Sequence, residues 1–207
     1  MKSYHFKNVG RQVFICIASG WILLSASGGS AQAQIFDSPP CAGDELAAAN
    51  AALSQVGPVL DKAIAALKNP NVSDAAYMDV WLGIKSHPSP AADNVISILE
   101  RSRAFVSGVN FRCAVKSTTL YARVRSTVPF TIDLHRGFFI ALPHGYSSRP
   151  GILIHEMSHF LLTGGTADPS TRSLYGTEPA RERASKDPAA AQRNAENIEY
   201  FVESIAL

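Results

Sequence analysis

A histidine–glutamate–histidine motif inside an apolar run constrains this chain more than any other stretch. His155, Glu156 and His159 have the spacing H-E-x-x-H, and most other residues from 151 to 162 are apolar. This run predicts a buried helix, on which residues four apart project from one face, one turn from each other. Two imidazoles at that separation can occupy two corners of a zinc tetrahedron, with bonds of about 2.0–2.1 Å.

Glu156 lies one residue after His155 and is rotated from it by roughly 100° about the helix axis. Its carboxylate is therefore better placed to reach a water molecule at the metal than the metal itself, which is the position of a general base. The alternative is a buried helix whose two histidines are hydrogen bonded and bind no metal. Such a helix would bury three costly polar groups, so we favour the metal site.

A zinc site of this kind needs a third protein ligand. A third histidine six residues after His159 is excluded, because Gly165 stands at that position. Asp168 is one candidate, since Gly164 and Gly165 can end the helix and reverse the chain just before it. A glutamate from a later helix is the other candidate, with Glu199 the best of four; the remaining three are Glu182, Glu196 and Glu203.

The motif and the residues after it resemble the aspzincin metallopeptidases, the family of deuterolysin and the peptidyl-Lys metalloendopeptidases. That family carries H-E-x-x-H, then G-T-x-D, then a Tyr-Gly pair. The matching residues of this chain are His155, Glu156, His159, Gly165, Thr166, Asp168, Tyr175 and Gly176. A looser resemblance over 77–83 and 194–202 extends it to most of the chain after residue 40.

The resemblance implies a Zn²⁺ ion bound by His155, His159 and Asp168, with Glu156 as the general base. It also implies that Tyr175 donates a hydrogen bond to the oxyanion formed in the reaction. Thr166 is expected to shape the turn or to orient a ligand. The chain departs from the family in having six residues, 169–174, between Asp168 and Tyr175, where the family usually has two.

The predicted function is that of a zinc-dependent metalloendopeptidase that hydrolyses peptide bonds with a zinc-activated water. Lysine-directed cleavage would need an acidic pocket, for which the segment 177–187 offers Glu178, Glu182 and Asp187. Two other classes stay open: a catalytically silent zinc-binding recognition module, and a metallo-amidase that acts on cell-wall peptides. Glu156 argues against the silent module, because a structural zinc site has no use for a base.

Residues 1–33 have the organisation of a secretory signal peptide. Three basic residues precede an apolar run over 13–24, and a small-x-small cleavage site ends at Ala33. The apolar run is short for a membrane span, although an uncleaved anchor is the alternative. We therefore expect a secreted or periplasmic protein that starts at Gln34 and has no membrane association after cleavage.

The remaining chain, 34–207, is long enough to form a single zincin-like domain with its own core. It has 16 Lys and Arg against 17 Asp and Glu, and no basic block. We expect a monomer that acts on a protein or peptide substrate and has no nucleic-acid partner. Its two cysteines, Cys41 and Cys113, suggest one disulfide in an exported protein, with two buried thiols as the alternative.

The hydrophobic pattern predicts an α+β, zincin-like fold, mainly helical, with a small, mostly antiparallel sheet and a central motif helix. Helices are expected over 44–68, 73–81, 90–105, 151–162 and 188–205, the first kinked or split at Gly57-Pro58. Strands are expected over 111–115, 120–125, 130–134 and 138–142. We assign the cleft-lining edge strand to 138–143, because this segment directly precedes the motif helix.

Overall fold

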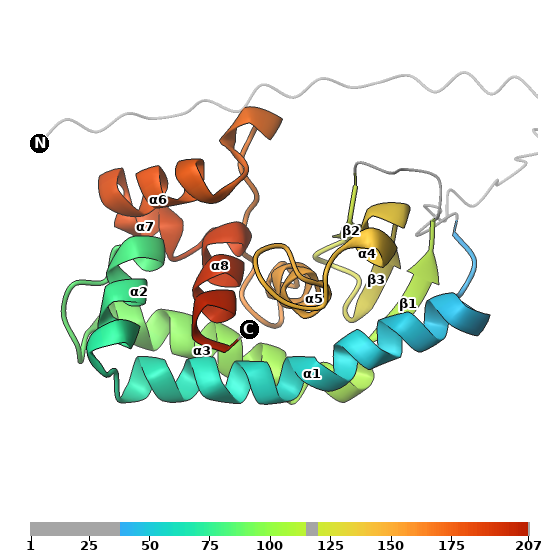
Figure 1. The fold of residues 1–207 in the computed structure, drawn as a ribbon, viewed down its shortest axis with the longest axis horizontal. Coiled ribbons are helices and arrows are strands. Elements are labelled where there is room, and N and C mark those ends of the chain that lie inside the picture. The colour runs from blue at the N-terminus through green and yellow to red at the C-terminus, as the bar shows by residue number, and fades with distance from the viewer. Residues whose placement is uncertain (1–37, 115–119, 207) are drawn as a thin grey trace, which may run out of the picture. The chain divides into compact units, whose positions relative to one another are not determined.

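The computed structural model describes residues 38–114 and 120–206, so the expected signal peptide lies outside the described residues. Helices dominate, and the motif helix α5 (Arg149–Ser158) lies between the sheet and the C-terminal helix α8 (Ala195–Ala206), as Figure 1 shows. This confirms the α+β class with a central motif helix. Among the described residues, no helix is both long and apolar enough to cross a membrane.

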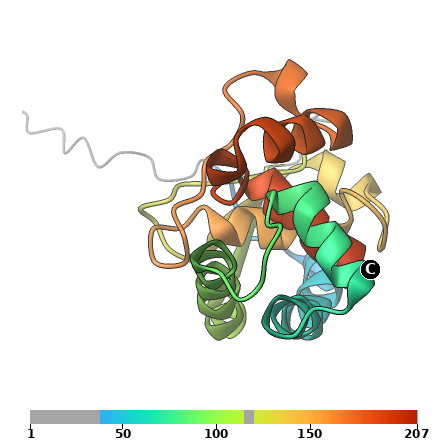
Figure 2. The same ribbon diagram turned by 90° about the vertical axis from the view of Figure 1, so that its left-hand side faces the viewer.

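Two long helices form the base on which α5 packs. They are α1 (Gly43–Lys68) and α3 (Pro90–Ala104), which lie side by side in Figure 2. α1 runs through Pro58 as one helix, so the predicted split is wrong. The buried stripe around Val56 and Leu60 continues on both sides of the proline, and this packing outweighs the loss of one backbone hydrogen bond.

Shorter helices complete the layer beside α8. α2 (Val72–Leu82) begins with a capping box in which Asn71 and Asp74 exchange side-chain and backbone hydrogen bonds. α6 (Thr177–Lys186) was not predicted, because its buried face consists of the small residues Ala180 and Ala184 and gives a weak apolar signal. The single helix expected over 188–205 is two helices, α7 (Pro188–Ala191) and α8.

The sheet has three strands in the order β1 (Asn110–Cys113), β3 (Thr131–Leu134) and β2 (Ala122–Val124). β1 pairs with β3 in parallel and β2 pairs with β3 antiparallel, so the sheet is mixed rather than mostly antiparallel. The outer edge of β1 is covered by residues 38–41, which pair with it through Cys41 N–Phe111 O (3.1 Å) and Cys113 N–Pro39 O (2.9 Å). β2 is therefore the edge strand.

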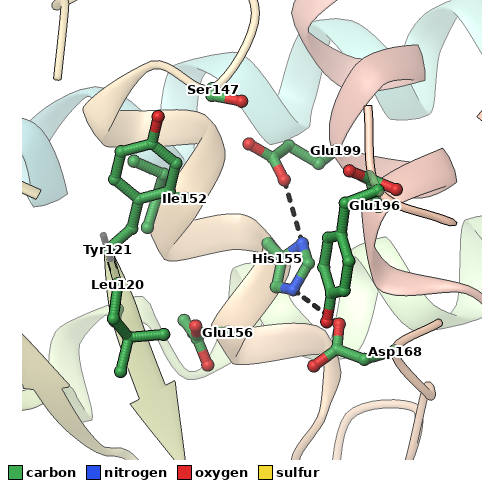
Figure 3. Close-up of a pocket in the computed structure, with 11 residues that line it drawn as sticks. Leu120, Tyr121, Ser147, Ile152, His155, Glu156, Asp168, Glu196 and Glu199 are labelled. Carbon is green, nitrogen blue, oxygen red and sulfur yellow. Dashed lines mark hydrogen bonds and ion pairs between the residues drawn. The ribbon is translucent and has the colours of Figure 1, made fainter. Parts of the chain in front are cut away.

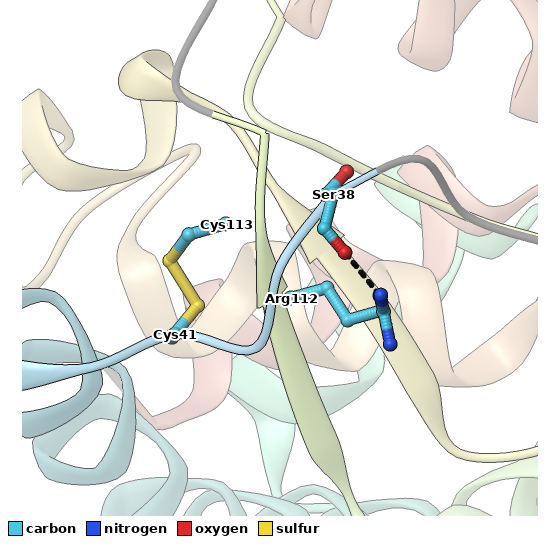
Figure 4. The surroundings of a disulfide bond; sticks show 4 residues. All are labelled: Ser38, Cys41, Arg112 and Cys113. Atoms are coloured by element: carbon cyan, nitrogen blue, oxygen red, sulfur yellow. Dashed lines mark hydrogen bonds between the residues drawn. A yellow bond between two sulfur atoms is a disulfide. The ribbon is translucent and has the colours of Figure 1, made fainter.

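A disulfide joins this covering segment to the sheet. Cys41 and Cys113 are bonded, as predicted, and the Nε of Arg112 donates to the carbonyl oxygen of Ser38 at 2.6 Å (Figure 4). The bridge joins residues 72 positions apart in the sequence and so fixes the start of the domain to β1. Closing a loop of that length restricts the unfolded chain and stabilises the folded one.

The strand predicted over 138–142 is wrong, because residues Arg136–Ile140 form a short helix, α4. β2 already occupies the edge of β3 that this segment would need, and the N–H of His135 bonds to Tyr121 O at 2.9 Å. The chain then turns away, with Gly137 packed so closely on Leu120 that a Cβ atom would lie 2.5 Å from its carbonyl oxygen. The cleft is accordingly lined by 120–122 at β2, not by 138–143.

Candidate active site

The motif helix is anchored at its first turn. Ser148 caps α5, with its Oγ accepting a hydrogen bond from the N–H of Gly151 at 3.1 Å. The Glu203 carboxylate of α8 accepts bonds from Ser147 N (3.1 Å), Ser148 N (2.8 Å) and Ser148 Oγ (2.7 Å). This arrangement requires Gly151, because a Cβ atom there would lie 1.9 Å from Glu203 Oε1. The start of α5 is therefore fixed against α8.

The two motif histidines lie at the other end of α5, and each has one ring nitrogen already engaged. His155 Nδ1 lies 2.9 Å from Glu199 Oε2, and His159 Nδ1 lies 2.8 Å from the carbonyl oxygen of Thr166. A carboxylate and a carbonyl oxygen can only accept, so both Nδ1 atoms are the donors. Each Nε2 is thereby the nitrogen that can bind a metal, which requires that it carry no proton.

Asp168 faces both Nε2 atoms. Its Oδ1 lies 3.0 Å from His155 Nε2 (Figure 3). Its Oδ2 lies 3.3 Å from His159 Nε2. The ligand atoms of the three residues all lie within 4.8 Å of one another. Asp168 is brought there by the turn at Gly165, whose φ of +59° suits glycine.

The strand-like pairing of Ala167 completes the placement of Asp168. Ala167 N donates to Arg193 O at 2.9 Å, and Ala195 N donates to Ala167 O at 3.1 Å. These bonds use the break between α7 and α8, which a continuous helix would not provide. The interruption of the predicted 188–205 helix thus holds the residue directly before Asp168.

This cluster fits a zinc ion. His159 Nε2 is buried, and among the described residues it meets only the Asp168 carboxylate, 3.3 Å away and outside hydrogen-bond geometry, which is costly unless a ligand occupies the site. Two imidazole nitrogens and a carboxylate form a donor set that zinc prefers, and three protein ligands leave one position open. Glu199 contacts the opposite side of the His155 ring, so it orients a candidate ligand instead of joining the cluster.

The electrostatics of the cluster reflect the close approach of these groups. Desolvation by burial lowers the pKa of His155, but the hydrogen bonds that its ring donates to the Asp168 and Glu199 carboxylates raise that pKa well above its usual value. For Asp168, burial would raise the pKa, but the two histidines hold it well below its usual range. Asp168 is therefore an ionised ligand candidate.

Glu156 lies in the same pocket and is buried. Burial raises the pKa of its carboxyl group above the ordinary value, which suits a group that must take up and release a proton. Its carboxylate lies outside the three-residue cluster of ligand atoms (Figure 3). The structure thus brings the predicted base beside the predicted ligands.

Tyr175 also lines the pocket, despite the longer gap after Asp168. A 3₁₀ turn over Arg172–Leu174 takes up part of the extra length. Burial and the neighbouring Asp168 carboxylate raise the pKa of the Tyr175 hydroxyl, so it stays protonated and can donate a hydrogen bond. Thr166, predicted to shape the turn or orient a ligand, accepts a hydrogen bond from His159 Nδ1 through its carbonyl oxygen and so orients the ring of a candidate ligand.

The acidic wall of the pocket comes from α8. Glu196 and Glu199 both line it, and Glu196 Oε2 and Glu199 Oε1 are buried without a hydrogen-bond partner among the described residues. Burial raises the pKa of Glu196. From the sequence alone both residues are candidates only as metal ligands. Their spacing of three within a mostly apolar helix is the signal that could have indicated a shared face.

The acidic residues that the segment 177–187 offers for a lysine pocket lie elsewhere. Glu178 pairs with Arg181 at 3.2 Å, Glu182 pairs with Lys186, and the Asp187 side chain accepts a bond from Ala190 N at the start of α7. None of the three lines the pocket. They are candidates by charge alone. The geometry of α6 directs Glu178 and Glu182 to basic partners on the same helix, and Asp187 caps α7.

Comparison with known proteins agrees with this geometry. A family model described as aspzincin, lysine-specific metallo-endopeptidase, matches residues 70–203. A peptidyl-Lys metalloendopeptidase of Pleurotus ostreatus is 34% identical over 157 residues, which cover 75% of this chain and 89% of that protein. An extracellular protease of Aeromonas hydrophila is 38% identical over 96 residues, 46% of this chain. The chain spans only 26% of the length of that protease.

A solved structure supports the same relationship. The zinc peptidase from Grifola frondosa superposes with a TM-score of 0.70 and 29% sequence identity, covering 79% of this chain and 96% of that chain. The segment that the family model matches, residues 70–203, includes the motif helix, the turn to Asp168 and the pocket face of α8. With the family model covering most of the chain and a relative matched along nearly its whole length, this chain belongs to the aspzincin family of metallopeptidases.

Proposed function

We propose that the chain is a zinc-dependent metalloendopeptidase in which His155, His159 and Asp168 bind the metal. The observation that carries the proposal is the convergence of two Nε2 atoms and one carboxylate, with both Nδ1 atoms already used as donors. Buried Glu156 beside this cluster supplies the base that a purely structural zinc site would lack. The family relationship supports the same activity.

The chemistry divides between the metal and the side chains around it. When bound, zinc would act as a Lewis acid that polarises the scissile carbonyl and acidifies the attacking water. Glu156 accepts a proton from that water and then delivers it to the nitrogen of the leaving amine. Tyr175, a protonated phenol in the same pocket, donates a hydrogen bond to the carbonyl oxygen as negative charge develops on it.

The edge strand β2 is the surface on which we propose that the substrate lies. Residues 120–122 line the pocket, and β2 pairs with β3 on one side only within the described part of the chain. An extended peptide can add to such an edge through main-chain hydrogen bonds, which hold the backbone without selecting a side chain. This geometry suits cleavage within a chain.

The acidic pocket supports lysine-directed cleavage. An ammonium group carries three donors and no acceptor, and the unpartnered oxygens of Glu196 and Glu199 offer it two buried acceptors with negative charge. Relatives from Pleurotus ostreatus and Armillaria mellea are named peptidyl-Lys metalloendopeptidases. We propose that the side chain of a substrate lysine enters between these two carboxylates.

A panel of substrates tests the activity. Unfolded protein, lysine-containing peptides and cell-wall fragments are incubated with the zinc-loaded protein, and the products are mapped by mass spectrometry. We expect cleavage of the polypeptides at lysine. Exclusive release of cell-wall fragments would favour a metallo-amidase, and no turnover of any substrate would favour a silent binding module.

Glu196→Gln tests the lysine pocket in the same assay. Removing one of two charges from the pocket should lower kcat/KM for lysine peptides by about tenfold or more. Glu182→Gln, on the exposed face of α6, is the matched control and should leave this value unchanged. Unaltered lysine cleavage by Glu196→Gln would refute the pocket assignment.

We also propose export, with a mature domain that begins at Gln34. The Cys41–Cys113 disulfide suits an oxidising compartment, and the Aeromonas hydrophila relative is named an extracellular protease. Mass spectrometry of protein recovered outside the cytoplasm should give an N-terminus at Gln34. Recovered protein that retains Met1 would refute cleavage at Ala33.

A further inference from the structure

The backbone on both sides of Tyr175 is held by side chains from two helices. Gly176 N donates to Glu196 Oε1 at 2.8 Å, and Arg183 Nη2 donates to the carbonyl oxygen of Leu174 at 3.3 Å. We infer that Glu196 and Arg183 are positioning residues, which aim the Tyr175 hydroxyl at the substrate carbonyl by fixing these two peptide groups. The inference rests on the proposed role of Tyr175 as the oxyanion donor.

Glu196 is built for this task because its two oxygens face different partners. Oε1 accepts from Gly176 N and from the Tyr200 hydroxyl at 3.1 Å, whereas Oε2 is buried in the pocket wall without a partner among the described residues. The side chain is 4% exposed, so its position is set by packing within α8. One carboxylate thus joins the lysine pocket to the Tyr175 segment.

Arg183 is fixed in turn from the side of α8. Its Nη1 donates to Asn197 Oδ1 at 2.8 Å and to Asn194 Oδ1 at 3.2 Å, while Nη2 reaches Leu174 O. These contacts leave the planar guanidinium little freedom to move. Arg183 therefore extends the rigid face of α8 to the residue before Tyr175.

The conformation between the two anchors explains why they are needed. Gly176 has a φ of +107°, in a region that L side chains rarely adopt, and Tyr175 is 40% exposed. The segment leading to it, 169–174, is longer than the family spacing. A half-exposed phenol on such a segment reaches a defined position only when its backbone is held.

A functional consequence follows from the shared carboxylate. A lysine ammonium bound at Glu196 Oε2 restrains the same side chain that holds Gly176 through Oε1. Lysine substrates should therefore gain in kcat as well as in binding, because occupancy of the pocket also steadies the oxyanion donor.

A double-mutant cycle tests whether Arg183 acts through Tyr175. Arg183→Ala should lower kcat by about ten- to a hundredfold with little change in KM, and should have a much smaller effect in a Tyr175→Phe background. Arg181→Ala, an arginine on the same helix that contacts Glu178 and Trp81, is the control and should leave kcat unchanged. Equal losses in both backgrounds would overturn the inference.

Hydrogen exchange of the Gly176 amide gives a second readout that needs no turnover. Glu196→Ala should speed this exchange, and Glu196→Gln should not, since a glutamine Oε1 still accepts the bond. Unchanged exchange in Glu196→Ala would overturn the positioning role. Failure of the peptidase proposal is distinguishable, because it would appear as no turnover of any peptide by the unsubstituted protein, while Glu196→Ala would still speed exchange of the Gly176 amide.

Discussion

The two helices that meet in the pocket, α5 and α8, contribute to the site in different ways. α5 places two candidate ligands and the candidate base within five consecutive residues, so its own helical period creates the geometry. α8 places Glu196, Glu199 and Glu203 on one face, and each holds a partner from 20 to 56 residues away in the sequence. The reactive groups that a short sequence motif specifies are therefore positioned by contacts between residues far apart in the sequence.

The division has a physical basis. A helix fixes the relative directions of its own side chains, but it cannot fix its rotation or depth within the fold. The carboxylates of α8 hold the site in position by hydrogen bonds at three points: Ser148 at the start of α5, His155 near its end, and Gly176 in the Tyr175 segment. Loss of a reactive side chain on α5 should consequently abolish a step of the reaction. Loss of a carboxylate on α8 should instead move a reactive side chain out of position.

The sharpest test of this contrast is Glu156→Gln. The change removes the proton acceptor but keeps the shape and the helix, so kcat should fall by about 10²–10⁴-fold while zinc binding is retained. Peptide turnover and zinc content measured on the same preparation decide the point. Normal turnover would show that the base lies elsewhere.

The zinc affinities of two variants distinguish a candidate ligand, Asp168, from a residue that orients a candidate ligand, Glu199. Asp168→Ala removes a carboxylate from the cluster and should weaken zinc binding by more than Glu199→Ala, for which a loss of about 10–100-fold is expected. Both are measured by competition with a chelator of known affinity. If Asp168→Ala stays loaded while Glu199→Ala is empty, the two roles must be exchanged.

The contact between the helices is tested by Gly151→Ala. A Cβ atom at 151 would lie 1.9 Å from Glu203 Oε1, so the Glu203 carboxylate must leave its hydrogen bonds to Ser147 and Ser148 or α5 must shift from α8, at a cost of about 1–3 kcal/mol in unfolding free energy. Gly108→Ala is the control, because the nearest atom to a Cβ there is 3.9 Å away. Chemical denaturation of both variants measures the difference, and equal stabilities would contradict a close α5–α8 contact.

The smallest effect is expected away from both helices. Asn71→Ala removes the capping box of α2 and should lower the unfolding free energy by about 1 kcal/mol. Because Asn71 contacts no residue of the pocket, kcat should be unchanged. A lower kcat in this variant would mean that general loss of stability, and not displacement of particular groups, accounts for the effects on α8.

Prediction from sequence succeeded where the information is local. The H-E-x-x-H helix, the glycine turn before Asp168 and the bonded pair Cys41–Cys113 each depend on a short pattern or on a count of two. Prediction from sequence failed where a run of apolar residues is compatible with both a strand and a helix. Phe138 and Phe139 are as compatible with a strand as with a helix, and only the occupied edge of β3 excludes the strand.

The sequence by itself determined which groups could carry the chemistry, because the spacing of His155, Glu156 and His159 has one outcome on a helix. Only the tertiary structure decided which carboxylate faces the metal-binding nitrogens and which one orients a histidine. The glycine turn and the family resemblance favour Asp168 as the third ligand, with Glu199 as the rival candidate. In the structure the backbone bonds of Ala167 bring Asp168 to the Nε2 atoms, while the packing of α8 brings Glu199 to Nδ1. Such contacts depend on how separate helices pack, and no local pattern records that.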